Sequence, residues 1–380
     1  MNDFHQKLTA FRRDLHRHPE LGFEETRTKA KIATALRALG LSVSEGVGVV
    51  GVLKCGSGTR AIALRADMDA LPISETSAHE YSSLTPGVMH ACGHDGHTTM
   101  LLGAAELLSQ SQDFDGTVIF VFQPNEEHGL GARAMLDEGF NEIFAPDEIY
   151  AIHNLPGAPL AEVSTRIGQI CASESLFEIR ITGQGGHASM PHLGVDAITV
   201  AAELVMALQT IVARKLPPGA GAVVSVTEIS SDGQRNVLPG TALLKGDVRA
   251  RLPQDRDEIR KFMKQITSGL AATHNVQIDM QFNTEFIETI NAKEPTDSVI
   301  RVANAQGLTN IRNRPAMSFS EDFAQFSAVI PGCFFLLGNG TDGPHGQALH
   351  RSNYDFNDAL LPVGANFWAA LVRDRLPKRK

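Results

Sequence analysis

Short apolar runs alternate with helical patterns over the first half of the chain, and this alternation constrains the fold more than any other feature. Residues 61–64 and 117–122 are apolar runs of the length of buried strands, and residues 148–152 form a weaker one. A helical pattern at residues 98–108 separates the first two runs. Strands that alternate with helices favour a mostly parallel sheet covered on both faces. We therefore expect a doubly wound α/β domain.

The order of elements changes between residues 175 and 288. Strand and helix patterns there follow the order β-α-β-β-α-β, which is typical of a ferredoxin-like α+β unit. The α/β pattern then resumes, with a strand at residues 333–337 and a final helix at 361–376. We expect a catalytic domain built from residues 1–174 and 289–380, interrupted by an inserted domain.

Composition narrows the classes of partner. The formal net charge is −9 and no long run of lysine or arginine occurs, which argues against a nucleic-acid or anionic-membrane partner. The four cysteines are scattered without a CxxC pair, so we expect reduced thiols rather than a disulfide framework. No apolar run is long enough to cross a bilayer, and the first residues lack an apolar signal core. We expect a soluble cytoplasmic protein.

Side chains that bind divalent metals follow the expected strands and flank expected helices. They are Asp67, Asp69, Cys92, His94, Glu126, Glu127, His153, His345 and His350. Ligands of open α/β sheets bind at the carboxyl ends of the strands, and thiolate, imidazole and carboxylate together are the ligand set of zinc and its neighbours. Each residue also has an ordinary interpretation as a cap, a solvated carboxylate or a packed histidine. Their coincidence at one edge of the sheet favours a metal site.

The adjacent carboxylates of Glu126 and Glu127 could have two different roles. Neighbouring residues of an extended segment point to opposite sides, so one carboxylate can bind a metal while the other faces a substrate. A metal-bound water has its pKa lowered to about 7, and a nearby carboxylate can accept its proton. This arrangement suits amide hydrolysis.

A covalent alternative makes Cys92 the nucleophile, with a nearby histidine as base. The N-terminus of the expected helix would lower the pKa of the thiol, which serves both interpretations. A Cys–His enzyme would have no need of Glu126, Glu127 and His153, so this alternative ranks second. The zinc-deaminase pattern, His-x-Glu followed by Pro-Cys-x-x-Cys, does not occur in the sequence.

Eight motifs in a fixed order resemble those of a known family. They are RDLHRHPELGFEE (13–25), RADMDALPI (65–73), HACGHDGH (90–97), QPNEE (123–127), GGHAS (185–189), RNVLP (235–239), SEDF (320–323) and LH (349–350). Together they resemble the amidohydrolase branch of the two-metal aminoacylase and carboxypeptidase family. That branch includes hippurate hydrolases, aminoacylases, N-acetyl-diaminopimelate deacetylases and plant auxin-conjugate hydrolases. The resemblance extends from near residue 10 to near residue 365.

The resemblance implies a set of metal ligands. Cys92 matches the metal-bridging thiolate of the branch, and the other ligands match His94, Glu127, His153 and His350. The implied cofactor is two divalent ions per subunit, and zinc, manganese, nickel and cobalt all accept this ligand set.

The resemblance also implies roles around the metals. Glu126 matches the general base and acid, and Asp69 matches the aspartate that supports a ligand from behind. The inserted domain resembles the lid and dimerisation domain of the family, which predicts a homodimer or homotetramer. In that domain His187 matches the residue that stabilises the tetrahedral oxyanion, in its own or the partner subunit's site. Asn236 and Arg249 match residues that hold the substrate carboxylate.

Several of these residues keep a second interpretation. Arg249 lies inside an expected strand and could simply pair with an acid. His97, in the first turn of a helix, suits packing or support of a ligand, and His345 competes with His350 as a ligand. Asn125 stands where the branch commonly has a small residue; because the following carboxylates are intact, we expect little change from it.

The expected function is hydrolysis of N-acyl amino acids, such as hippurate or N-acetyl amino acids, to a carboxylic acid and a free amino acid. One alternative is a dipeptidase or carboxypeptidase on the same scaffold. Another is a non-catalytic relative that binds an amino-acid ligand, against which the intact Glu126 and ligand set argue. In each case the expected partner is a small molecule, without nucleic acid or membrane.

Overall fold

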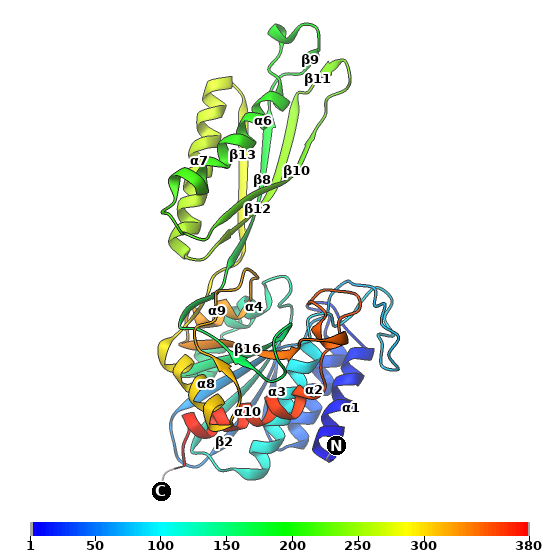
Figure 1. The fold of residues 1–380 in the computed structure, drawn as a ribbon, viewed down its shortest axis with the longest axis vertical. Helices are drawn as coiled ribbons and strands as arrows, with labels where there is room; N and C mark the ends of the chain where they lie inside the picture. Colours follow the sequence, from blue (N-terminus) through cyan, green and yellow to red (C-terminus); the bar gives the residue numbers. More distant parts are fainter. Residues whose placement is uncertain (1–2, 379–380) are drawn as a thin grey trace. The chain divides into compact units, whose positions relative to one another are not determined.

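The computed structural model describes residues 3–378, and the chain divides into two compact units (Figure 1). Unit 1 contains the residues up to 170, residues 289–316 and those from 321 onward. Unit 2 contains residues 171–288 and the short segment 317–320. The chain therefore leaves unit 1 twice, once for the long insertion and once for four residues.

Unit 1 is built on an eight-stranded sheet in the order β1-β2-β4-β3-β5-β16-β6-β15. Its strands are β1 (Ser42–Glu45), β2 (Val49–Cys55), β3 (Ala61–Asp67), β4 (Gly116–Gln123), β5 (Glu148–Pro156), β6 (Val163–Ser164), β15 (Asn310–Ile311) and β16 (Gly332–Gly340). The central strands β4, β3, β5 and β16 are mutually parallel. The expected mostly parallel sheet is confirmed, while the antiparallel β1–β2 edge was not predicted.

Helices cover both faces of this sheet (Figure 1). They are α1 (Asp3–Arg17), α2 (Thr26–Ala38), α3 (His94–Ser111), α4 (Gly131–Asp137), α5 (Phe140–Phe144), α8 (Lys293–Ala305), α9 (Phe323–Ser327) and α10 (Leu360–Arg375). The apolar sides of α1, α2, α3, α8 and α10 share one core with alternate residues of the strands. On the other face α9 packs against β16, with the rings of Phe323 and Phe334 6.2 Å apart, and against α5, with Phe140 and Phe326 5.3 Å apart.

A sharp bend at Gly93 sets the start of α3. The φ of Gly93 is +93°, and a Cβ at this position would lie 2.4 Å from Oδ1 of Asn154. Only glycine fits both the backbone conformation and the space. Because of this bend α3 begins at His94, four residues before the helical pattern at residue 98, so the imidazole belongs to the first turn.

Unit 2 is a four-stranded antiparallel sheet in the order β10-β12-β8-β13. Its elements in chain order are β8 (Ser173–Thr182), α6 (Ala197–Leu208), β10 (Val223–Ser231), β12 (Thr241–Ala250), α7 (Pro253–His274) and β13 (Gln277–Phe286). The buried side chains of α6 and α7 pack on one face of the sheet. The element order confirms the expected ferredoxin-like unit.

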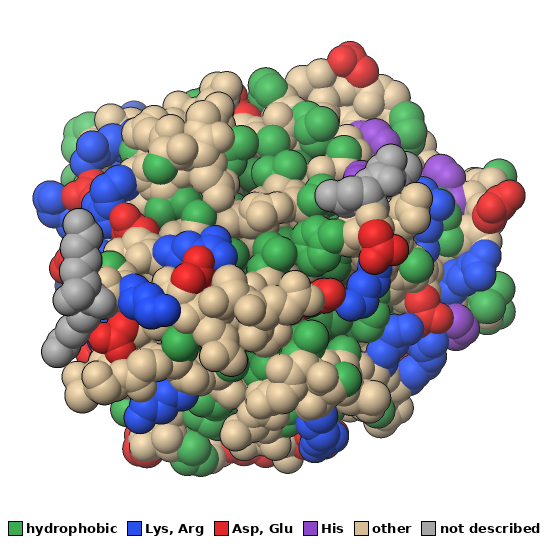
Figure 2. Space-filling view, turned by 90° about the horizontal axis from the view of Figure 1, so that it is seen from below, with side chains coloured by type: hydrophobic (Ala, Val, Ile, Leu, Met, Phe, Trp, Pro, Cys, Tyr) green, Lys and Arg blue, Asp and Glu red, His purple; other side chains and the backbone are tan. Residues whose placement is uncertain are grey.

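Smaller elements complete the chain. The short strands are β7 (Gly168–Cys171) with β14 (Thr289–Asn291), and β9 (Gly186–His187) with β11 (Val237–Leu238); the short helical turns are Pro191–Leu193, Ile211–Lys215 and Gly343–Gly346. No helix within residues 3–378 is long and apolar enough to cross a membrane. Figure 2 shows acidic and basic side chains interspersed on the face that it presents, with apolar side chains between them.

Candidate active site

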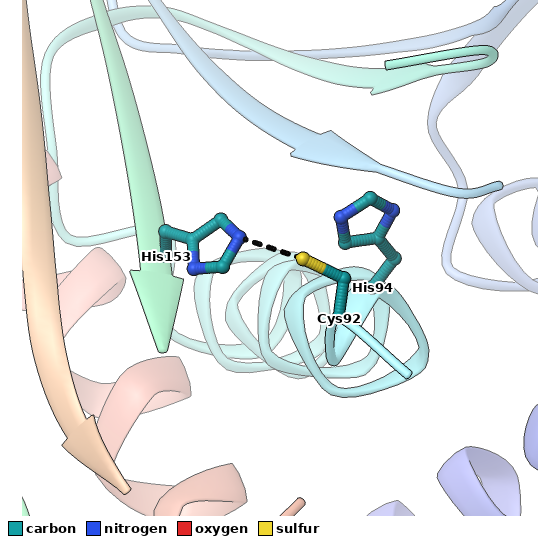
Figure 3. Close-up of side chains that lie close together, drawn as sticks. All are labelled: Cys92, His94 and His153. Atoms are coloured by element: carbon teal, nitrogen blue, oxygen red, sulfur yellow. Dashed lines mark hydrogen bonds between the residues drawn. The ribbon is translucent and has the colours of Figure 1, made fainter. Parts of the chain in front are cut away.

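The predicted metal-binding side chains of unit 1 come from four separate segments. Cys92 lies just before α3 and His94 is the first residue of that helix, whereas His153 lies on β5. Figure 3 shows the thiol of Cys92 between the two imidazoles, with Nε2 of His153 3.3 Å from Sγ of Cys92. Glu127 follows β4, and His350 follows the helical turn at residues 343–346. The fold therefore gathers residues that are up to 258 positions apart, from 92 to 350.

Backbone carbonyls fix the proton positions of the two imidazoles. Nδ1 of His94 lies 2.9 Å from the carbonyl oxygen of Asp69, and Nδ1 of His153 lies 2.7 Å from that of Asn154. A carbonyl oxygen only accepts hydrogen bonds, so each Nδ1 carries a proton and donates it. In the neutral ring the lone pair is then on Nε2, and this tautomer is a form that binds metals.

The ligand atoms form groups whose members lie within 4.8 Å of one another. One group consists of Cys92, His94 and His153, and another of Cys92, Glu127 and His350. Cys92 belongs to both groups. His350 has a φ of +63° and a half-exposed side chain, and its backbone N–H donates to the carbonyl oxygen of Ala91 at 2.9 Å. This bond ties the late segment to the one that carries Cys92.

Electrostatics at this cluster favour a bound cation. Burial raises the pKa of Glu126 well above its usual range, and the carboxylates of Glu321 and Glu127 raise it further. Burial likewise raises the pKa of Glu127, to about 8, with a further contribution from Asp69. Nε2 of His94 and Oε1 of Glu127 are buried and have no hydrogen-bond partner among residues 3–378. Divalent ions fit this arrangement. Their charge would offset the repulsion between the buried carboxylates, and they would bind the two atoms that have no hydrogen-bond partner.

The pKa of the Cys92 thiol shifts in the direction opposite to the expected one. The N-terminus of the helix was expected to lower its pKa, but burial raises that pKa well above its usual range, and Glu127 and Glu126 raise it further. Desolvation and neighbouring negative charge therefore outweigh the helix end. A nucleophilic cysteine needs a stable thiolate, so this environment argues against the covalent alternative. A metal ligand, in contrast, loses its proton to the ion.

Asp69 lies behind two of the predicted ligands. Its Oδ1 is 3.1 Å from Nδ1 of His94, and its Oδ2 accepts from the backbone N–H of Glu127 at 3.0 Å. One carboxylate therefore orients a ligating ring and the backbone of a ligating glutamate. This geometry suits the supporting role that the resemblance implies.

A buried network around Arg65 was missed at the level of sequence. The guanidinium of Arg65, with no exposed surface, contacts Asp67 at 2.9 Å, Glu321 at 3.0 Å and Gln123 at 2.8 Å. The backbone N–H of Asp322 donates to Oε1 of Glu126 at 3.2 Å. An arginine inside an apolar strand pattern is the signal that could have revealed this network, because arginine is almost never fully buried without partners.

Two further histidines, His97 and His345, have different surroundings. Nδ1 of His97 is 2.7 Å from Asp67, and its Nε2 accepts from the backbone N–H of Asn154 at 2.9 Å. Both ring nitrogens are therefore engaged, in line with a supporting role. His345 lies 3.6 Å from Asp355 and belongs to none of the groups that could hold a metal among the described residues.

Two of the three predicted residues of unit 2 lie together. His187 pairs with Val237 across β9 and β11, and the N–H of Ala188 donates to the carbonyl oxygen of Asn236 at 3.1 Å. The side chains of His187 and Asn236 are exposed at this tip of unit 2.

Arg249 lies at the other end of the unit 2 sheet, paired with Glu174 on β8. It is eight residues along β12 from Thr241, or about 27 Å at about 3.4 Å per residue. Its guanidinium contacts Glu174 at 2.6 Å, Asp247 at 2.9 Å and the hydroxyl of Ser320 at 2.9 Å. The acid pairing that the sequence left open for Arg249 is therefore present.

Comparisons with known proteins agree with the geometry of unit 1. A family model described as Peptidase family M20/M25/M40 matches residues 63–374. Hippurate hydrolase of Campylobacter jejuni is 37% identical, with 97% of each chain covered. IAA-amino acid hydrolase ILR1-like 5 of Arabidopsis thaliana is 36% identical, covering 97% of this chain and 87% of the relative. Thermostable carboxypeptidase 2 of Saccharolobus solfataricus is 35% identical, covering 96% and 94%.

A solved structure agrees as well. The YXEP protein of Bacillus subtilis, described as a dinuclear metal binding peptidase from the M20 family, has a TM-score of 0.86 at 31% identity, with 98% of both chains covered. The expected resemblance is thereby confirmed, and the chain belongs to the M20/M25/M40 peptidase family.

Proposed function

We propose that this chain is a metal-dependent amidohydrolase that cleaves the amide bond of N-acyl amino acids. In this proposal its two divalent ions are held by Cys92, His94, Glu127, His153 and His350. One observation carries the proposal: two groups of three ligand atoms share the sulfur of Cys92. Family membership and the names of the relatives, which include hippurate and auxin-conjugate hydrolases, support the same reaction.

The side chains of the site have separate tasks in the hydrolysis. Ions held by these residues would supply Lewis acidity for the amide carbonyl and for water. Glu126 accepts the proton of the attacking water and then donates it to the leaving nitrogen. Asp69 keeps His94 and Glu127 in place during the reaction.

The substrate has an acyl side and an amino-acid side, and residues of unit 2 are assigned to it. We assign His187 to the oxyanion of the tetrahedral state and Asn236 to the carboxylate of the amino acid. Their exposure and adjacency at the tip of unit 2 support these roles. For Arg249 we favour a structural role, because Glu174 and Asp247 already neutralise it.

A second candidate is a carboxypeptidase or dipeptidase that uses the same site. A relative of 35% identity is named a carboxypeptidase, and the chemistry at the carbonyl would be identical. The two candidates differ in what lies on the acyl side of the bond: a simple acyl group, or an amino acid with a free amine.

We also assign this chain to a homodimer or homotetramer formed through unit 2, in the cytoplasm. The exposed apolar side chains of Ile198 and Met206 on α6 and of Ile229 on β10 support self-association. Light scattering of the purified protein would test it, and a monomer at micromolar concentration would refute it.

Hydrolysis of a substrate panel by the purified protein tests the proposal. N-benzoyl, N-acetyl and indoleacetyl amino acids are compared with free dipeptides, as isolated, after exhaustive chelation, and after adding back zinc, manganese, cobalt or nickel. We expect acyl amino acids to be preferred, activity to disappear on chelation and at least one metal to restore it. Preference for dipeptides would favour the second candidate. Activity that survives chelation but not thiol alkylation would return the chemistry to Cys92.

A further inference from the structure

The N-terminal motif at residues 13–25 has no part in the chemistry described so far. Its second half lies beside two of the loops that form the site. The N–H of Ala70 donates to the carbonyl oxygen of Glu20 at 2.9 Å, next to Asp69. The N–H of Asn125 donates to Oε1 of Glu25 at 2.9 Å, next to Glu126. The segment 20–25 thus touches the backbone on both sides of the site.

The backbone of Asn125 has a conformation that needs support from neighbouring residues. Its φ is +48°, in the left-handed region that costs an ordinary residue about 1 kcal/mol or more and that asparagine tolerates best. Its side-chain oxygen lies 2.7 Å from Nδ1 of His128. A Cβ at Gly22 would lie 2.0 Å from that same oxygen. The glycine of the motif therefore makes room for the side chain of Asn125, the residue before Glu126.

A role for Glu25 in capping its own helix is excluded by the contacts. Glu25 precedes α2, but its side chain makes no hydrogen bond to that helix. Glu20 takes this task, because its carboxylate accepts from the backbone N–H groups of Arg27 at 2.9 Å and Thr28 at 2.8 Å. The carboxyl group of Glu25 is turned instead to Asn125.

Burial of the Glu25 carboxyl group has a cost in free energy, which argues for a functional role of its hydrogen bond with the N–H of Asn125. The residue is 1% exposed, and its Oε2 has no hydrogen-bond partner among the described residues. Burial raises the pKa of Glu25 to about 7. Replacing such a group by an apolar one of similar size is often neutral for stability, so stability alone gives no reason for a glutamate here.

We propose that Glu25 is a positioning residue for Glu126, acting through the N–H of Asn125. The inference rests on the proposed role of Glu126 as the proton carrier. After Asn125, the loop is anchored by Asp69, which accepts from the N–H of Glu127, and by Asp322, whose N–H donates to Glu126. Glu25 is the side-chain anchor on the preceding side. Without it the left-handed turn can relax and carry the carboxylate of Glu126 away from the reacting atoms.

The experiment compares Glu25→Leu with Glu25→Gln, two side chains of similar size of which only glutamine keeps an acceptor oxygen. Glu24→Leu is the matched control, because Glu24 is an exposed neighbour in the same motif. Each variant is assayed for kcat and KM on an N-acyl amino acid, for metal content and for its thermal midpoint. A displacement of about 1 Å can cost about 100-fold in rate, so we expect Glu25→Leu to lower kcat by about 10- to 100-fold.

We expect KM, metal content and fold to stay near those of the parent enzyme in Glu25→Leu, and kcat to be restored to within about threefold by Glu25→Gln. A kcat for Glu25→Leu within about twofold of the parent would overturn the proposal. So would loss of metal in that variant, which would assign Glu25 to the ligands, or an equal loss of kcat in Glu25→Gln. Glu126→Gln is measured alongside: if it keeps full turnover, Glu126 is not the proton carrier and the role of Glu25 fails with it, whereas a parent enzyme without turnover of N-acyl amino acids would refute the proposed function instead.

Discussion

Two buried charge clusters lie in unit 1, and they are built on opposite principles. The site cluster holds Asp67, Asp69, Glu126, Glu127 and Glu321, with Arg65 as its arginine. The Arg12 cluster holds Arg12, His16, Glu75, Asp95 and Asp355. The first holds five carboxylates with one arginine, and the second holds three carboxylates, each of which contacts Arg12 or His16.

Pairing in the Arg12 cluster is direct. Nε of Arg12 and Nδ1 of His16 each lie 2.8 Å from Asp95, and NH2 of Arg12 lies 3.4 Å from Asp355. Burial would lower the pKa of Arg12, but Asp95 and its neighbours raise it above its usual range. The hydrogen bond from His16 helps to hold the pKa of Glu75 at about 2, although burial opposes it.

At three side chains of the site the pKa shifts have the opposite sign, although His94, His97 and Arg65 hold the pKa of Asp67 well below its usual range against the effect of its burial. Burial and mutual repulsion raise the pKa of the thiol of Cys92 and of the carboxyls of Glu126 and Glu127. A protein keeps such a cluster only if something else supplies the missing positive charge. A buried cluster whose carboxylates contact cationic side chains therefore supports the fold, whereas a cluster with few cationic side chains indicates a binding site for a cation.

The largest effect is expected from breaking the paired cluster. Arg12→Met leaves Asp95 and Asp355 buried without their cation, which should lower the free energy of unfolding by about 3–5 kcal/mol. Urea denaturation measures it, and the folded fraction should still contain its metals. The control is Lys7→Met, which breaks an exposed 2.7 Å pair with Glu106 and should cost less than about 1 kcal/mol. Equal losses in the two variants would refute the contrast.

A smaller effect is expected from the support of the site cluster. An amide has one acceptor oxygen, so Asp69→Asn cannot serve both His94 and the N–H of Glu127. Metal affinity should fall by about 10- to 100-fold. Competition with a chromophoric chelator measures the affinity. An unchanged affinity would remove Asp69 from the account.

The smallest expected effect is on the pH dependence of the free energy of unfolding, which should have opposite signs for the two clusters. Glu75 titrates at about 2 in the folded protein instead of 4.5, so its contribution is present above pH 4.5 and is lost as pH falls toward 2. Glu75→Gln should therefore cost about 1–2 kcal/mol at pH 7 and little near pH 2.

In the metal-free site the sign reverses. Glu127 titrates at about 8 instead of 4.5, so stability should rise as pH falls from 8 toward 4.5. The free energy of unfolding, measured as a function of pH for the metal-free and the metal-bound protein, checks these pH dependences. A metal-free protein that weakens steadily between pH 8 and 5 would contradict the assignment.

The sequence predicted the parallel sheet because that prediction depends on local patterns. The end of a strand is visible in the local sequence, and Glu127 follows the end of β4, whereas β5 continues past His153 to Pro156. The Arg12 cluster could not be predicted, because Arg12 meets Asp355 across 343 positions. The thiol pKa of Cys92 was predicted in the wrong direction, since helix position is visible in a sequence and burial among carboxylates is not.

The most direct test of the account measures metal content and turnover on the same sample of Glu126→Gln. A glutamine fills the space of the carboxylate but cannot carry the proton, so the account predicts two divalent ions per chain and a kcat lowered by about 10²- to 10⁴-fold. The parent protein, reconstituted in parallel, gives the reference for both quantities. Turnover at the parental rate with the metals bound, or a variant that has lost its metals, would contradict the assignment of Glu126 as the proton carrier beside the ions.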